Sequence, residues 1–239
     1  MALNIIRQGD SGDNRHSIFL YGMPKVGKTT EACKFPHTLA LDCEPRGTQF
    51  VRTADKLQIK NLSDLEQQID EILRQPHKTL VVDGITWMLE QAAKTLQDRD
   101  PRQAYKKVGD RFQLLIGKIL SSDKIVVATG HSRKIEDPEK QGKTIIQPDM
   151  NPDLADSVFG VFSVVCYCFP VENGASKMLT KPDDNDKRRI MAGDRSGKLP
   201  RLMDLSAAKL MEGLGMNIAQ SSTPATPAPA TENGGTHGV

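Results

Sequence analysis

One short run of residues is suited to holding a phosphate chain: Gly22-Met-Pro-Lys-Val-Gly-Lys-Thr29. It follows the apolar residues 18–21 and precedes an expected helix over 28–35, which is the strand–loop–helix context of a glycine-rich phosphate loop. The glycines allow backbone N–H groups to surround an anion, and the helix start adds partial positive charge. We therefore expect ATP to bind here together with Mg²⁺.

Within this loop, Lys28 is expected to contact the β- and γ-phosphates, and the Thr29 hydroxyl is expected to bind Mg²⁺. The predicted nucleotide-binding residues are Gly22, Met23, Pro24, Lys25, Val26, Gly27, Lys28, Thr29 and Thr30.

Two acidic positions follow expected strands. A carboxylate just past the strand after the phosphate-loop helix can face the γ-phosphate and polarise the attacking water. Glu44 is the favoured residue for this role, and Asp42, two residues earlier on the same face, is the alternative; both can also be plain surface acids. Asp83 closes an aliphatic strand, and we expect it to hold Mg²⁺ with Thr29. Alternatively, Asp83 has only a structural role and caps the next helix.

His131 follows the fourth expected strand, where a polar side chain can contact the γ-phosphate and relay its presence to the next loop. A solvated loop histidine is the alternative. The predicted catalytic group therefore consists of Lys28, Glu44, Asp83 and His131.

Strands and helices alternate in the first part of the chain, and strands dominate later. Polar segments over 98–105 and 132–148 interrupt this pattern, and Asn173-Gly174 is typical of a hairpin turn. The pattern predicts an α/β fold: a mostly parallel sheet with helices on both faces and a β-hairpin-rich C-terminal edge. We expect strands over 18–21, 37–42, 79–83, 124–129, 161–169, 176–181 and 188–192, and helices over 28–35, 63–73, 85–97, 105–121, 151–159 and 206–214. Ligands of such sheets bind beyond the carboxyl ends of the strands.

Composition suggests one domain. The chain has 239 residues, and 1–220 suit a single core, whereas the Pro/Ala/Thr-rich segment 221–239 is expected to be disordered. The four cysteines form no paired C-x-x-C motif, and Cys166 and Cys168 are expected to face the core. No apolar run reaches membrane-spanning length and the N-terminus is unlike a signal peptide, so we expect a cytoplasmic protein without a membrane partner.

The net charge of +2 is unevenly distributed. Residues 94–143 carry 12 Lys and Arg against 7 Asp and Glu, and residues 177–201 carry 8 against 4. Two basic stretches on an otherwise acidic chain favour a polyanionic partner, although solvated helix faces produce similar local excesses.

In this order, the motifs resemble the RecA-like P-loop ATPase core. The family has a phosphate loop, a strand ending in an acid-x-Glu pattern (here Asp42-Cys-Glu44), an aliphatic strand ending in Asp83, and a strand ending in a γ-phosphate sensor. That sensor is usually Gln, where this chain has His131. Phage-encoded, core-only members that act in single-strand annealing and recombination look closest. The resemblance implies DNA-stimulated hydrolysis of ATP to ADP and phosphate, in the host cytoplasm if the chain is phage-encoded.

The resemblance also implies partners. In this family two loops grip single-stranded DNA, here by element order the segments near 98–107 and 132–148, and subunits complete one another's ATP sites in a homo-oligomer, either a ring or a short filament. A single-strand-binding protein is a further possible partner. The implied DNA-binding residues are Arg99, Arg102, Tyr105, Lys106, Lys107, Arg133, Lys134, Lys140 and Lys143, and the residues implied to reach a neighbouring ATP site are Lys181, Arg188 and Arg189.

Two other functions fit a phosphate loop. A small-molecule kinase would need a lid bearing arginines, which residues 188–201 can supply; Glu44 argues against it, because kinases must exclude water from the phosphoryl group. A nucleotide-gated loader of replication or recombination would act through protein partners, with the tail as a docking segment.

Overall fold

The computed structural model describes residues 16–216 apart from 46, 97–99 and 173. Its centre is a run of parallel strands in the order β7-β1-β5-β4-β2-β3, extended beyond β7 by the antiparallel strands β8 and β12. The strands are β1 (Ser17–Gly22), β2 (Thr38–Asp42), β3 (Asp55–Gln58), β4 (Thr79–Asp83), β5 (Ile125–Glu136), β6 (Thr144–Pro148), β7 (Val164–Pro170), β8 (Ser176–Leu179), β9 (Asp183–Asp184), β10 (Arg188–Ile190), β11 (Gly193–Asp194) and β12 (Leu202–Asp204).

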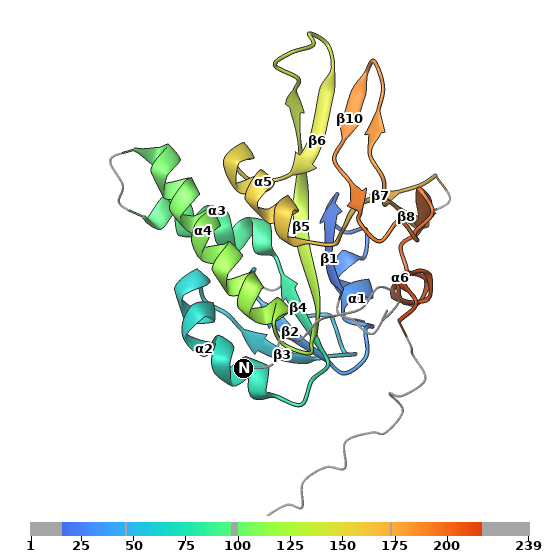
Figure 1. Cartoon of the computed structure of the whole chain (residues 1–239). Helices are drawn as coiled ribbons and strands as arrows, with labels where there is room; N and C mark the ends of the chain where they lie inside the picture. Colours follow the sequence, from blue (N-terminus) through green and yellow to red (C-terminus); the bar gives the residue numbers. More distant parts are fainter. Residues whose placement is uncertain (1–15, 46, 97–99, 173, 217–239) are drawn as a thin grey trace, which may run out of the picture.

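Helices cover both faces of this sheet (Figure 1). They are α1 (Lys28–Ala32), α2 (Leu62–Arg74), α3 (Ile85–Thr95), α4 (Pro101–Leu120), α5 (Pro152–Val161) and α6 (Ala207–Leu214). One core joins α2, α3, α4 and α5 to the sheet, and the other joins α1 and α6 to its opposite face. The predicted class, a mostly parallel α/β sheet with helices on both faces and a hairpin-rich C-terminal edge, is confirmed.

The central strands are apolar on both sides because both sides are covered. In β1, Phe19 and Tyr21 enter one core whereas Ile18 and Leu20 enter the other, and all four are fully buried. Such strands appear in a sequence as continuous apolar runs rather than as an alternating pattern. This is why the runs that end in the site residues were recognisable as strands.

A group of hairpin strands projects from the carboxyl edge of the sheet (Figure 1). β5 continues past the central sheet and pairs antiparallel with β6, β6 pairs with β10, and β10 pairs with β9. We call β6, β9, β10 and the outer half of β5 the projecting hairpins. The Tyr21 hydroxyl fixes their base to β1, because it donates to the carbonyl oxygen of Met191 and lies 3.4 Å from that of Ile146.

The projecting hairpins correct one prediction. Residues 132–148 were expected to form a long polar loop, but Ser132 to Glu136 pair in register with Pro148 to Thr144. The ten paired residues contain only three isoleucines, and two of these are adjacent, so neither an apolar run nor a regular alternation marked the strands.

Three further features of the elements differ from the prediction. The polar segment 98–105 was expected to be a loop, yet α4 begins at Pro101, with the Asp100 side chain accepting a hydrogen bond from the Arg102 backbone N–H. An N-cap Asp followed by Pro is a helix start. α2 begins at Leu62, one residue before the expected range, and the side chain of Asn61 caps it. The short edge strand β3 was not predicted, because its polar sequence carries no strand pattern.

Two other expectations can be compared with the described residues. Cys166 and Cys168 are fully buried in the same core, as predicted. Among the described residues, no helix has the length and apolar character needed to cross a bilayer. The tail 221–239 and Asn173 of the expected hairpin turn lie outside the described residues.

Candidate nucleotide-binding site

The phosphate loop connects β1 to α1 and has the backbone that its sequence predicts. Lys25 and Gly27 lie in the left-handed region, with φ of 63° and 92°. Gly22 has φ of 152°, and a Cβ atom at this position would lie 2.0 Å from the carbonyl oxygen of Cys168 in β7. Glycine at position 22 is therefore needed for the loop to leave the sheet beside a neighbouring strand.

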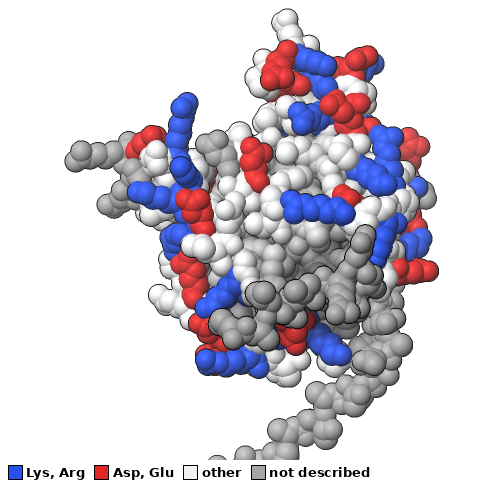
Figure 2. Space-filling model, in the orientation of Figure 1, with Lys and Arg blue, Asp and Glu red and all other residues white. Residues whose placement is uncertain are grey.

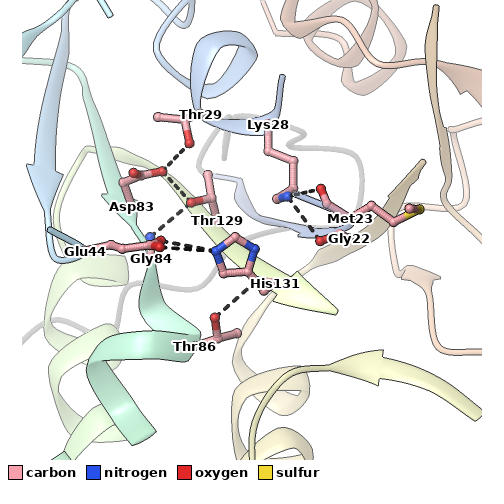
Figure 3. A network of polar contacts seen from close by, with 10 residues as sticks. All are labelled: Gly22, Met23, Lys28, Thr29, Glu44, Asp83, Gly84, Thr86, Thr129 and His131. Carbon is pink, nitrogen blue, oxygen red and sulfur yellow. Dashed lines mark hydrogen bonds and ion pairs between the residues drawn. The ribbon is translucent and has the colours of Figure 1, made fainter. Parts of the chain in front are cut away.

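The Lys28 side chain is buried and turned back onto its own loop (Figure 3). Its ammonium group donates to the carbonyl oxygens of Met23, at 2.7 Å, and Gly22, at 3.2 Å. Burial lowers the pKa of Lys28. An ammonium group held by neutral carbonyls in a buried site lacks a counterion, which makes it a favourable partner for a phosphate oxygen.

Three side chains form a hydrogen-bonded group: Thr29 of α1, Asp83 at the carboxyl end of β4 and Thr129 within β5 (Figure 3). Both hydroxyls donate to Asp83 Oδ1 at 2.6 Å, and Thr129 Oγ1 accepts from the backbone N–H of Gly84 at 3.1 Å. The predicted pairing of Thr29 with Asp83 is thus present in the geometry. Sequence analysis did not select Thr129, although a hydroxyl residue ending an aliphatic strand was a usable signal.

Asp42 lies beside Asp83, because these two residues are register partners in β2 and β4. Asp42 Oδ2 accepts hydrogen bonds from Thr48 Oγ1 at 2.7 Å and from the Thr48 backbone N–H at 3.2 Å, whereas its buried Oδ1 has no hydrogen-bond partner among the described residues. Gly47 covers the pair: a Cβ atom there would lie 2.4 Å from Asp83 Oδ2 and 3.0 Å from Asp42 Oδ1. Asp42 therefore belongs to a buried pair with Asp83 under Gly47. Of the two candidates for orienting the attacking water, Glu44 is the better placed to contact water.

Glu44 and His131 meet across the site (Figure 3). The His131 Nε2 atom lies 3.3 Å from the Glu44 carboxylate, and both side chains are about one-third exposed, at 36% and 32%. The hydrogen bond from His131 lowers the pKa of Glu44. The carboxylate is consequently ionised at neutral pH, as a group that accepts a proton from water or orients it must be.

The donor set fits Mg²⁺. Thr29 and Asp83 offer oxygen atoms within hydrogen-bond distance of each other, and oxygen is the ligand type that Mg²⁺ prefers. Among the described residues, no group of three or more His, Cys, Asp or Glu side chains is arranged to hold a metal by itself. Mg²⁺ usually binds through one or two carboxylates together with substrate phosphates, and Asp83 would supply such a carboxylate here.

Burial raises the pKa of Asp83, and the two hydroxyl hydrogen bonds only partly oppose that effect. Keeping Asp83 ionised in the folded protein therefore costs free energy. The protonated form contributes stability below the pKa of Asp in the unfolded chain, about 4, and this stability is lost as pH rises through the pKa of Asp83 in the folded protein. We expect Asp83→Asn, which keeps an acceptor for both hydroxyls, to raise the unfolding temperature of the ligand-free protein at neutral pH by about 2–4 °C, the effect of about 1 kcal/mol in a domain of this size.

Thermal unfolding between pH 4 and 7 tests this expectation. The stability advantage of Asp83→Asn should grow with pH, whereas Asp70→Asn, at a carboxylate paired with Lys118 and 62% exposed, should show no such growth. An advantage that stays constant or shrinks towards neutral pH would contradict a raised pKa at Asp83.

A phosphate loop at the carboxyl edge of a parallel sheet, with an acid that pairs with its threonine and a second acid facing the site, defines a P-loop nucleoside triphosphatase. Residues 14–196 match the family model described as AAA domain, and the chain belongs to this family. A P-loop ATPase of this kind binds ATP with Mg²⁺. Among solved structures, the chain is similar to the KaiC-like protein PH0186 from Pyrococcus horikoshii OT3, at 14% identity and a TM-score of 0.46, over 70% of this chain and 78% of that chain. No curated protein matches the sequence.

The residues predicted to bind DNA lie in three places. Arg102, Lys106 and Lys107 are exposed in the first turns of α4, Arg133 and Lys134 are at the start of the projecting hairpins, and Lys140 is exposed at the end of the β5–β6 hairpin. Figure 2 shows that basic and acidic side chains are interspersed on the visible face, including the projecting part. Arg99 lies outside the described residues.

Lys143 has an intramolecular role. Its side chain is 5% exposed and forms an ion pair with Asp184 of β9. This pair joins the two hairpins, and it leaves little of the Lys143 side chain exposed to a DNA strand.

The predicted trans-acting residues Lys181, Arg188 and Arg189 are all exposed on the segment that includes β9 and β10. The guanidinium group of Arg188 forms an ion pair with Asp183 at 2.9 Å. Their role at a neighbouring ATP site remains a prediction.

Proposed function

We propose that this protein is an ATPase that binds single-stranded DNA in an ATP-dependent manner and acts in strand annealing or recombination, like the core-only RecA-type proteins. The observation that carries the proposal is the position of His131. Its ring pairs with Glu44 in the nucleotide site, and the same residue lines a cavity together with Tyr105 and Arg133. The two segments predicted to hold DNA thus meet beside the nucleotide site, although 28 positions separate these two residues in the sequence.

The chain's own residues support a division of work in hydrolysis. Lys28 would neutralise charge on the β- and γ-phosphates, Thr29 and Asp83 would hold Mg²⁺, and Glu44 would orient the attacking water. Bound Mg²⁺ supplies charge neutralisation for the transferring phosphoryl group. His131 is placed to relate the state of Glu44 to the segments around the cavity.

ATP turnover with and without single-stranded DNA tests this proposal. We expect unpaired DNA to stimulate turnover, and binding of DNA to be tighter with ATP than with ADP. The physical reason for both effects is that His131 contacts Glu44 in the nucleotide site and also lies beside the segments proposed to bind DNA. Arg102→Ala together with Lys106→Ala should weaken DNA binding but leave DNA-independent turnover unchanged.

Other outcomes would assign a different function. Transfer of phosphate from ATP to a small molecule would indicate a kinase. Turnover that is indifferent to every nucleic acid, together with capture of a protein partner, would indicate a nucleotide-gated loader. The proposed homo-oligomer, a ring or short filament, and a single-strand-binding partner belong with DNA-stimulated turnover and are measurable by light scattering and co-sedimentation.

A further inference from the structure

The cavity beside His131 has a defined composition. Its volume is about 310 Å³, which is the lower end of the range of small-molecule sites, and its lining includes Thr86, Trp87, Glu90, Tyr105, Arg133 and Asn151. These residues come from α3, α4, β5 and the start of α5. Glu44 is not part of the lining, so the cavity and the nucleotide site are separate spaces that share His131.

The walls of the cavity are held in place by internal hydrogen bonds. The Glu90 carboxylate accepts from the Tyr105 hydroxyl at 3.3 Å and from the backbone N–H of Asn151 at 2.8 Å. The backbone N–H of His131 donates to Thr86 Oγ1 at 3.1 Å. The cavity is therefore preformed, with its aromatic side chains positioned before any ligand arrives.

One buried donor in the lining is unused. Arg133 Nε is buried and has no hydrogen-bond partner among the described residues. A buried donor left without a partner costs free energy, which an acceptor on a bound ligand would recover. Trp87 and Tyr105 are both partly exposed and provide aromatic surfaces in the same lining.

The charges of the lining favour a neutral occupant. Lys94 and Arg133 are balanced by Glu90 and Asp149, so the carboxylates would repel a phosphate inside the cavity. A nucleobase is planar and uncharged, stacks on aromatic side chains, and carries acceptors for an arginine donor. The phosphates attached to it would remain outside, near the exposed cations at the start of α4.

We propose that this cavity receives one unpaired nucleobase of the bound strand, stacked on Trp87 or Tyr105 and hydrogen-bonded by Arg133. This inference rests on the proposed function and adds that the protein senses a base, beyond gripping the phosphate backbone. A base in the cavity contacts the residue whose ring is paired with Glu44, so its arrival changes the surroundings of the group that orients water.

Trp87 is the chain's only tryptophan, so intrinsic fluorescence reports on the surroundings of this one side chain, which lines the cavity. In the presence of a non-hydrolysable ATP analogue, the full chain is titrated with an oligothymidylate and, separately, with an abasic oligonucleotide of equal length. We expect the thymidylate strand to quench Trp87 and, with ATP, to stimulate turnover. The abasic strand should bind through its phosphates but neither quench nor stimulate.

Two variants of Tyr105 sharpen the test. Tyr105→Leu removes the ring, and we expect it to weaken thymidylate binding by about tenfold, the scale of one lost base–aromatic stack. Tyr105→Phe keeps the ring and loses only the hydroxyl bond to Glu90, so it should bind within about twofold of the wild type. Affinity for the abasic strand should be the same in all three proteins.

The outcomes separate this inference from the proposed function. Equal quenching and equal stimulation by thymidylate and abasic strands would overturn the base site while leaving single-strand binding standing. Quenching by free thymidine as strong as by the strand would indicate a small-molecule site and would also overturn it. Failure of both strands to bind would refute the proposed function and, with it, the base site. The comparison of strands on the wild-type chain decides the matter even if Tyr105→Leu does not fold.

Discussion

Glu44→Gln is expected to lower ATP turnover by about 10²-fold or more, the scale of a positioned general base. The pKa of Glu44 is lowered by the hydrogen bond from His131, so the wild-type carboxylate is ionised and can accept a proton from water. A glutamine can still contact His131 but has lost that basicity. Nucleotide affinity should stay within about threefold, because the phosphate loop is untouched. Steady-state release of phosphate and equilibrium binding of a fluorescent ATP analogue measure the two quantities.

Glu71→Gln is the matched control for this change. It makes the same chemical replacement at an exposed position of α2 and should leave turnover unaltered. If Glu44→Gln hydrolyses ATP at the wild-type rate, Glu44 does not orient water. Asp42→Asn would then be the next variant to measure, because Asp42 belongs to the same acidic group.

Lys28→Ala is expected to weaken ATP binding by about 10- to 100-fold or more, which corresponds to the loss of charge-assisted hydrogen bonds worth about 1.5–3 kcal/mol. The lysine ammonium lies buried within its loop, held by two carbonyl oxygens. We expect it to exchange those carbonyl oxygens for phosphate oxygens when ATP binds. Without it, the loop retains only its backbone N–H groups for the anion.

Thermal unfolding gives a second measurement of the same change. ATP with Mg²⁺ should raise the unfolding temperature of the wild type, since a ligand that binds only the folded state stabilises it. Lys28→Ala should lose most of that rise. Lys34→Ala removes a lysine two residues beyond α1, from an exposed pair with Glu31, and should keep the rise in full. An undiminished shift in Lys28→Ala would show that the anion is held elsewhere.

The two buried aspartates of the site were predictable because each ends an apolar run. Asp42 and Asp83 close the strands β2 and β4 at the carboxyl edge, and parallel pairing brings such ends together. Thr129 follows an apolar run within β5 in the same way but was not selected. The phosphate loop adds a sequence motif in which backbone geometry requires glycine. Local sequence therefore indicated the phosphate loop and the acids at the strand ends, together with the edge of the sheet on which they meet.

Other features depend on tertiary structure that no local pattern encodes. The cavity beside His131 joins Trp87, Tyr105 and Arg133 from three elements, and nothing in the spacing of these residues indicates a shared space. Gly47 covers the two buried aspartates only because the loop after β2 folds back over them. The outer half of β5 and β6 were missed for a different reason, because their mostly polar sequences lack an apolar run.

The hydroxyl of Tyr21 has a mechanical consequence. It sits one residue before the phosphate loop and is bonded to the backbone at the foot of the hairpins, where burial raises its pKa so that it stays protonated at neutral pH. This buried hydrogen bond thereby couples the projecting hairpins to β1, the strand that ends at Gly22. A movement of the hairpins relative to the sheet would therefore either break this hydrogen bond or shift the start of the phosphate loop.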